Sequence, residues 1–214
     1  LMIETFGNFV RDYSDFDFVF KFQFRDIPSF IHPDYKDRMD VKYVKRFSET
    51  ALSKEQFARM FDRVKSLGMK VMTTPFDENS VDLAEELDVD IIKIASCSCG
   101  DWPLLERIIK VDKPIVFSTA GASFDTIDKM VSFFQHREKN FAIMHCVGEY
   151  PTSSNRLQMN QLTLLKERYP GVPIGFSTHE DPENYDAVFA AVGKGAQLFE
   201  KHVAIETEQY PKNA

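Results

Sequence analysis

Seven short apolar runs recur along the 214-residue chain, and segments with helical periodicity separate them. In most of these runs apolar residues follow one another directly, as in parallel strands that are covered on both faces. After the first run, the spacing between runs is mostly about 20–35 residues, the length of one βαβ unit. The runs lie at residues 16–24, 70–74, 91–95, 114–118, 141–146, 173–177 and 197–203.

Helical signals fill the intervals between the runs. Ser53 and Gln56 stand three residues apart, as in a capping box, and Gly68 is the residue type that often ends a helix. Ser123 is predicted to cap a later helix, and Pro182 to lie in the first turn of the last one. Apolar residues recur at helical spacing in all three helices, namely Phe57, Met60, Phe61, Val64 and Leu67; Phe124, Ile127, Val131 and Phe134; and Tyr185, Val188, Phe189 and Val192.

Seven strands that alternate with helices leave two main architectures, an open doubly wound sheet and a (β/α)₈ barrel. The sequence has neither the Rossmann glycine fingerprint nor a P-loop. Polar residues gather at the carboxyl ends of many strands, where barrel enzymes carry their active sites. We therefore predict one α/β domain over residues 1–214, a TIM (β/α)₈ barrel that lacks the first strand and the C-terminal end. Residues 24–50 would form a long connection that can cover a site.

Charge and hydropathy exclude several classes of protein. Asp and Glu number 33 against 26 Lys and Arg, and the net charge of −7 does not attract nucleic acid or anionic lipid overall. No apolar run approaches the roughly 18–20 residues of a membrane span. Three cysteines are too few for a disulfide framework, which favours a cytoplasmic protein. The sequence thus predicts no nucleic-acid partner and no membrane association.

Two histidines end consecutive predicted strands, in Ser177-Thr178-His179 and Glu200-Lys201-His202. Side chains two residues apart in a strand share a face, so each histidine points the same way as the first residue of its triplet. Two neutral imidazoles beside a carboxylate suit a divalent metal such as Mn²⁺, Fe²⁺, Co²⁺ or Zn²⁺. Two separate, hydrogen-bonded histidines are the alternative. His145 is expected to be hydrogen-bonded within the barrel, and His32 and His136 to be solvated.

Lys21 and Lys93 lie inside otherwise apolar predicted strands. Burying a lysine costs free energy unless an anion or a carboxylate pairs with it. Two such lysines favour a clamp for the phosphate or carboxylate of a ligand, and a structural ion pair with an acid such as Asp77 is the alternative. Hydroxyl groups, which are natural donors to phosphate oxygens, repeat at equivalent strand ends. They belong to Thr73, Thr74, Ser96, Ser118, Thr119 and Ser177.

Taken in chain order, these strand ends resemble the sialic acid synthase family, which condenses phosphoenolpyruvate with an N-acetylated amino sugar. The resemblance runs from about Phe16 to Val203, and its seven motifs stand in the order of the family. They are Lys21-Phe22-Gln23, Thr74-Pro75-Phe76-Asp77, Lys93-Ile94-Ala95-Ser96, Ser118-Thr119-Ala120-Gly121, His145-Cys146 with Tyr150-Pro151, Ser177-Thr178-His179 and Glu200-Lys201-His202.

The resemblance implies a (β/α)₈ barrel and, after it, an antifreeze-like domain that reaches over the partner's active site in a homodimer. That domain is expected to be absent from residues 1–214. His179 and His202 match the metal-binding positions, with Mn²⁺ as the first choice and Mg²⁺ or Co²⁺ as alternatives. Lys21 and Lys93 match phosphoenolpyruvate-binding lysines, and Glu200 lies near the sugar; these three are the expected catalytic residues. Expected substrate-binding residues are Gln23, Phe76, Asp77, Ser96, Ser118, Tyr150 and Ser177.

The implied activity is a metal-assisted, phosphoenolpyruvate-dependent condensation with an N-acylated amino sugar such as N-acetylmannosamine. Its products would be a sialic-acid-type nonulosonic acid and phosphate. The protein would then be a cytoplasmic transferase of carbohydrate biosynthesis. Two alternatives stay open at this point: another metal-dependent, aldol-type barrel enzyme, and a non-catalytic relative that binds anionic ligands and regulates or scaffolds a partner.

Four positions depart from the family pattern. Ser98 stands where family members carry an acidic residue, and Thr178 stands where they have the Asp of Ser-Asp-His. Gly148 replaces an Asn that often precedes the Tyr-Pro pair, and Asn213 replaces the Asp of a Gly-Pro-Asp motif. The anion and metal positions are kept. We therefore expect the departures to affect the identity of the acceptor sugar more than catalysis.

Overall fold

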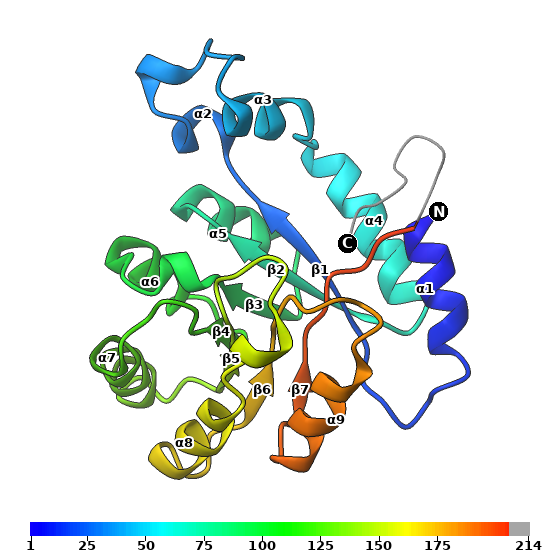
Figure 1. The fold of residues 1–214 in the computed structure, drawn as a ribbon. Coiled ribbons are helices and arrows are strands. Elements are labelled where there is room, and N and C mark those ends of the chain that lie inside the picture. Colours follow the sequence, from blue (N-terminus) through cyan, green and yellow to red (C-terminus); the bar gives the residue numbers. More distant parts are fainter. Residues whose placement is uncertain (206–214) are drawn as a thin grey trace. The chain divides into compact units, whose positions relative to one another are not determined.

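The computed structural model describes residues 1–205, so Asn213 lies outside the described part of the chain. The chain divides into two compact units. Unit 1 comprises Leu1–Lys93 and Asp101–Lys113, and unit 2 comprises Ile94–Gly100 and the chain from Pro114 onward. Strands and helices alternate along the chain in both units (Figure 1).

Three parallel strands form the centre of unit 1. In β1 (Val19–Phe24) and β2 (Lys70–Pro75), Lys21 pairs with Met72 and Gln23 with Thr74. In β2 and β3 (Ile91–Ile94), Thr73 pairs with Ile92. The helical elements of this unit are α1 (Met2–Val10), α2 (Ile27–Phe30), η1 (Pro33–Tyr35), α3 (Lys42–Glu49), α4 (Lys54–Ser66), α5 (Glu78–Glu86) and α6 (Trp102–Ile108).

Helix α4 shows how local signals and core packing agree. Its capping box is confirmed, because Ser53 Oγ accepts from the Gln56 amide while Gln56 Oε1 accepts from the Ser53 amide. Phe57 and Phe61 pack against Phe24 of β1, with ring centroids 4.5 and 5.9 Å apart. Gly68 follows the helix with φ of 83°, a left-handed conformation that glycine adopts without steric cost.

Four parallel strands form the centre of unit 2: β4 (Ile115–Ser118), β5 (Phe141–His145), β6 (Ile174–Phe176) and β7 (Leu198–Phe199), each paired with the next. Gly175 permits the close approach of β6 to β7, since a Cβ on it would come within 2.8 Å of the Leu198 carbonyl oxygen. The helical elements are η2 (Ser96–Ser98), α7 (Phe124–Gln135), η3 (Ser154–Arg156), α8 (Asn160–Arg168) and α9 (Tyr185–Gly193). Ser123 caps α7 as predicted, by accepting from the Thr126 amide.

Three expectations about the last elements were wrong. The strand predicted over 197–203 is paired only at Leu198–Phe199, because its partner β6 ends at Phe176. Pro182 lies before α9, which begins at Tyr185. The predicted apolar face of α9 is largely exposed, and the helix instead buries Ala187 and Ala191, whose small side chains allow close packing. Its exposed apolar residues are Tyr185, Phe189 and Val192.

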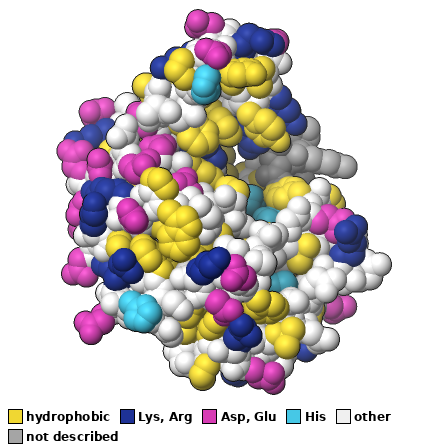
Figure 2. All heavy atoms as spheres, turned by 90° about the vertical axis from the view of Figure 1, so that its left-hand side faces the viewer, with side chains coloured by type: hydrophobic (Ala, Val, Ile, Leu, Met, Phe, Trp, Pro, Cys, Tyr) yellow, Lys and Arg dark blue, Asp and Glu magenta, His cyan; other side chains and the backbone are white. Residues whose placement is uncertain are grey.

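Segment 24–50, predicted as a connection, contains α2, η1 and α3. Helices α2 and α3 lie beyond the carboxyl end of β1 (Figure 1). The face presented in Figure 2 carries acidic and basic side chains interspersed with one another. None of the helices within residues 1–205 is long and apolar enough to cross a membrane. Both units have parallel strands that alternate with helices, which confirms the α/β class, while the closed barrel stays a prediction.

Candidate functional site

The carboxyl ends of β6 and β7 carry the most concentrated group of predicted site residues. The backbone ladder reaches the Phe176–Phe199 pair and ends with a hydrogen bond from the Glu200 amide to the Phe176 carbonyl, at 3.0 Å. Past the last backbone hydrogen bond, side chains of the two segments contact one another. Ser177 Oγ donates to Glu200 Oε1 at 2.8 Å, and the rings of the two predicted metal ligands lie 5.2 Å apart between centroids. The structure thus pairs Ser177 with Glu200 and His179 with His202, and a shared face for each histidine and the first residue of its triplet stays a prediction.

Tyr150 joins the two histidines from the loop that follows β5. Its hydroxyl lies 3.1 Å from His202 Nδ1, and its ring centroid is 4.6 Å from that of His179. The peptide bond between Tyr150 and Pro151 is cis. The same loop also binds the backbone of His179, because the Thr152 amide donates a hydrogen bond to the His179 carbonyl oxygen at 2.8 Å. We call Tyr150, His179 and His202 the imidazole cluster.

A second group of side chains lies next to these residues in the sequence. It consists of Thr178 and Glu180, on either side of His179, and Lys201, between Glu200 and His202. Glu180 is 9% exposed, and its two carboxylate oxygens accept from the Thr178 hydroxyl, at 2.5 Å, and from the Lys201 ammonium. Burial raises the pKa of Glu180, but the hydrogen bonds from Lys201 and Thr178 outweigh it and leave the pKa below its ordinary value. Glu180 is therefore a buried carboxylate held in its charged form.

The donor set of the imidazole cluster fits a divalent metal in part. His179 and His202 supply two imidazoles at close range, and neutral imidazole is a good ligand for borderline metals. Within residues 1–205 there is no group of three or more His, Cys, Asp or Glu side chains that could hold an ion. The two imidazoles are therefore the ligands that this part of the chain offers to an ion, and metal binding stays a prediction.

Two of the predicted phosphate-binding serines lie in unit 2, Ser96 at the start of η2 and Ser118 at the end of β4. Ser96 Oγ accepts from the Ala120 amide at 3.0 Å, so it shapes the loop that follows β4. Ser118, at the end of β4, is buried, and its carbonyl oxygen accepts from the Cys99 thiol at 3.2 Å. Ser98, which replaces an expected acid, is also buried in this region. The role of Ser96 and Ser118 as donors to a phosphate group stays a prediction.

In unit 1, strand register places the predicted lysines on one face. Gln23 pairs with Thr74, and one step beyond the Thr73–Ile92 pair brings Thr74 beside Lys93. Because paired residues of parallel strands point the same way, Lys21, Thr74 and Lys93 share a face of the sheet. Lys93 is only 2% exposed, as predicted, and Lys21 is half-buried. The buried Thr74 hydroxyl has no hydrogen-bond partner within the described structure, so this face has a polar atom ready for a ligand.

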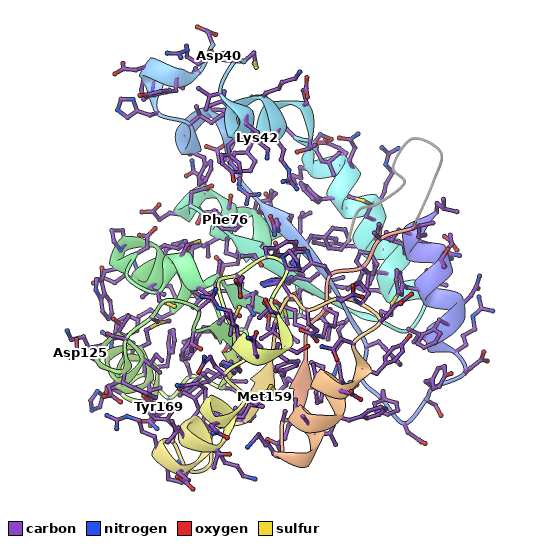
Figure 3. All side chains as sticks on the ribbon, viewed as in Figure 1. Asp40, Lys42, Phe76, Asp125, Met159 and Tyr169 are labelled. Carbon is purple, nitrogen blue, oxygen red and sulfur yellow. The ribbon has the colours of Figure 1, made fainter. Side chains whose placement is uncertain are left out.

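Sequence reasoning missed Arg25, which directly follows β1. Its guanidinium carbon lies 4.0 Å from the ring centroid of Phe76, the residue after β2 (Figure 3), and 4.3 Å from that of Phe47 in α3. Its Nη2 donates to Gln23 Oε1 at 3.0 Å. Arg25 therefore connects Gln23, through a hydrogen bond, with Phe76 and α3, through cation–π contacts. An arginine immediately after a strand of apolar residues was the signal available in the sequence.

Asp77 acts as a helix cap in this structure. One carboxylate oxygen accepts from the Ser80 amide at 2.7 Å, and the other accepts from the Asp26 amide at 2.9 Å. The first bond caps α5, and the second holds the start of the segment that contains α2. The structure thus gives Asp77 a role in shaping the carboxyl ends of β1 and β2, and its role as a substrate-binding residue stays a prediction.

His145 is a buried structural residue, as predicted, with Nε2 2.8 Å from the Leu157 carbonyl oxygen. His32 and His136 are exposed, also as predicted. A pocket of 330 Å³ lies beside His145 and Gly148 in unit 2, and its lining includes Gln158 but not the imidazole cluster. This pocket is therefore separate from the site at the ends of β6 and β7.

Burial lowers the pKa of His145 below its ordinary value of 6.5, so the unfolded chain binds its proton more readily than the folded protein does. The free energy of unfolding should therefore fall as the pH drops below about 6.5, and it should not depend on this group at higher pH, where His145 is neutral in both states. Urea denaturation between pH 5 and 8 measures this effect. In His145→Gln this part of the pH dependence should disappear, whereas in His136→Gln, at an exposed position, it should remain. An unchanged pH profile in His145→Gln would contradict the assignment.

Comparisons with known proteins agree with the geometry. The NeuB family profile matches residues 14–212. The chain is 30% identical over 197 residues to N-acetylneuraminate-9-phosphate synthase of Drosophila melanogaster, covering 88% of this chain and 52% of that one. It spans about half the length of the curated relatives it matches.

Two solved structures are similar as well. The crystal structure of the Chromobacterium violaceum protein assigned as spore coat polysaccharide biosynthesis protein E superposes with a TM-score of 0.94 at 52% identity, covering 99% of this chain and 62% of that one. N-acetylneuraminic acid synthetase from Leptospira borgpetersenii, solved with citrate, gives a TM-score of 0.74 at 28% identity over 85% and 61% of the two chains. The resemblance of the strand-end motifs to sialic acid synthases is thereby confirmed, and the chain belongs to the NeuB family.

Proposed function

We propose that this protein is a phosphoenolpyruvate-dependent nonulosonic acid synthase, which joins phosphoenolpyruvate to an N-acylated amino sugar. The observation that carries the proposal is the extension of β6 and β7, where the Ser177–Glu200 hydrogen bond and the imidazole cluster lie together. Family membership and relatives named as N-acetylneuraminate synthases support it. As part of the same proposal, the protein forms a closed (β/α)₈ barrel, acts in the cytoplasm and forms a homodimer.

The imidazole cluster would hold a divalent metal through His179 and His202, with Mn²⁺ as the first choice and Mg²⁺ or Co²⁺ as alternatives. Such an ion polarises a carbonyl oxygen as a Lewis acid, which suits the aldehyde of an open-chain sugar. Tyr150 would fix the orientation of one imidazole through its hydroxyl, which lies 3.1 Å from His202 Nδ1. A hydrogen bond on one ring nitrogen determines which nitrogen of a histidine is left for a ligand.

Phosphoenolpyruvate would be held by cationic and hydroxyl groups. Lys21 and Lys93 share one face of unit 1, and a charged donor forms stronger hydrogen bonds to phosphate and carboxylate oxygens than a neutral one. Ser96, Ser118 and Ser177 would donate further hydrogen bonds. Holding the substrate in this way lowers the entropic cost of bringing its methylene carbon to the aldehyde carbon.

The proposed reaction forms one carbon–carbon bond and breaks one carbon–oxygen bond. The methylene carbon of phosphoenolpyruvate attacks the aldehyde carbon, whose oxygen takes up a proton and becomes a hydroxyl. Water then adds to the cationic carbon that bears the phosphate, and phosphate leaves with its bridging oxygen. The products are a 2-keto acid and inorganic phosphate. Glu200 lies beside Ser177 and would accept or return a proton at the reacting oxygens.

Phosphate release tests the proposal directly. With phosphoenolpyruvate, Mn²⁺ and a panel of N-acylated amino sugars, we expect one phosphate to be released per keto acid formed, as measured by colorimetric phosphate assay and mass spectrometry. Release should require both the sugar and the metal, and EDTA should stop it. Absence of release with every acceptor, in a folded protein that still binds phosphoenolpyruvate, would instead favour a non-catalytic anion-binding protein.

A further inference from the structure

The two histidines lie beyond the end of the β6–β7 backbone ladder. Its last bond runs from the Glu200 amide to the Phe176 carbonyl, which leaves His179 and His202 each on a segment past the paired residues. A ladder cannot fix the distance between residues that lie outside it. Contacts outside the ladder therefore keep the imidazole rings 5.2 Å apart, and they include the contacts of Tyr150 and Thr152 described above and side-chain contacts between the two segments.

Lys201 makes the contacts between the segments on the side away from the imidazoles. Its ammonium group donates to the Thr178 carbonyl oxygen at 3.3 Å and to the Glu180 carboxylate. That carbonyl belongs to the peptide group that joins Thr178 to His179. The His179 amide of the same peptide group donates to Thr152 Oγ1 at 3.4 Å. Both polar atoms of the peptide before His179 are thus held by side chains.

Glu180 keeps Lys201 in this place. The carboxylate is buried, with its side chain 3% exposed, whereas the Lys201 side chain is 34% exposed and would otherwise extend into solvent. Thr178 Oγ1 fixes the second carboxylate oxygen at 2.5 Å, and the ammonium lies 4.6 Å from the ring centroid of Phe176. A buried carboxylate needs such partners, because removing a charge from water is unfavourable unless an opposite charge and hydrogen bonds replace the water.

We infer that Glu180 and Lys201 are positioning residues that hold the two histidine-bearing segments in register for binding a metal. The inference deepens the proposed function and depends on it for the metal. Thr178 stands where the family pattern has an acid, and Glu180 places a carboxylate two residues further on, where it reaches Lys201.

Cobalt binding tests the inference, with Co²⁺ alone as the probe and its visible absorption as the readout. Lys201→Met alone would leave Glu180 buried without its cation and risks unfolding, so the variant of choice is Glu180→Gln combined with Lys201→Met, which leaves no uncompensated charge. We expect its dissociation constant for Co²⁺ to rise about 10- to 100-fold. Asp125→Asn is the matched control, because it removes one partner of the exposed Asp125–Lys129 pair. Its Co²⁺ affinity should equal that of the wild type, and equal affinity in the double variant would overturn the inference.

Failure of the proposed function gives a different result. If the wild-type protein takes up no Co²⁺, the metal part of the proposed function is wrong, and amide hydrogen exchange then decides the inference. Exchange at residues 177–180 and 200–203 should be faster in the double variant than in Asp125→Asn. Equal exchange would overturn the positioning role whether or not the protein binds metal.

Discussion

Replacing His179 with alanine should abolish turnover, lowering kcat for phosphate release by about three orders of magnitude or more. His179 is half-buried, and its ring packs 4.6 Å from Tyr150 and 5.2 Å from His202. Alanine leaves one imidazole, which is a weak site for a divalent ion. Under the proposed function, loss of the metal removes a Lewis acid that stabilises the transition state by several kcal/mol, so the activation free energy rises.

The measurement pairs steady-state phosphate release with Co²⁺ binding and thermal denaturation. His136→Ala is the matched control, since His136 is an exposed histidine of the same unit. It should keep both activity and Co²⁺ binding. If His179→Ala stays folded and retains full activity, the metal-assisted mechanism is wrong, whereas loss of metal with retained phosphoenolpyruvate binding is the result that the mechanism requires.

Local sequence rules predicted most elements because the interactions behind them are local. The Ser53–Gln56 capping box needs only residues three apart, and Ser123 caps α7 in the same way. The predicted end of a strand was wrong where it depends on the length of the neighbouring strand. Segment 197–203 has an apolar, β-forming sequence, yet only Leu198 and Phe199 are paired, because β6 has just three residues to offer. The length of β6 cannot be predicted from the residues of segment 197–203.

The site divides in the same manner. The structure brings Ser177 to Glu200 and His179 to His202 across the two segments that follow β6 and β7, whereas the predicted grouping of each histidine with the first residue of its own triplet stays a prediction. Alternation along a strand leaves a second set of residues on the opposite side, and Glu180 belongs to it. Its partnership with Lys201 depends on how two separate segments meet, which a single sequence does not state. Arg25 was missed for the same reason, since its aromatic partners come from β2's end and from α3.

Lys93→Met should lower kcat/KM for phosphoenolpyruvate by about 100-fold or more, while the midpoint of thermal unfolding stays equal or rises. Lys93 is 2% exposed on a strand that is otherwise apolar. Burial of an ammonium group disfavours folding, whereas methionine fills a similar volume and needs no counter-charge. A buried side chain that supplies positive charge is expected where an anion binds.

The two outcomes of this substitution separate a substrate clamp from a structural ion pair. A clamp loses phosphoenolpyruvate affinity and keeps its thermal stability, because the missing charge matters only when the ligand is present. A structural pair loses stability, because a partner carboxylate is left buried and charged, and it keeps its affinity for phosphoenolpyruvate. Lys45→Met, at an exposed lysine of the same unit, should change neither quantity. Kinetics with varied phosphoenolpyruvate and calorimetry on the three proteins therefore decide which role Lys93 has.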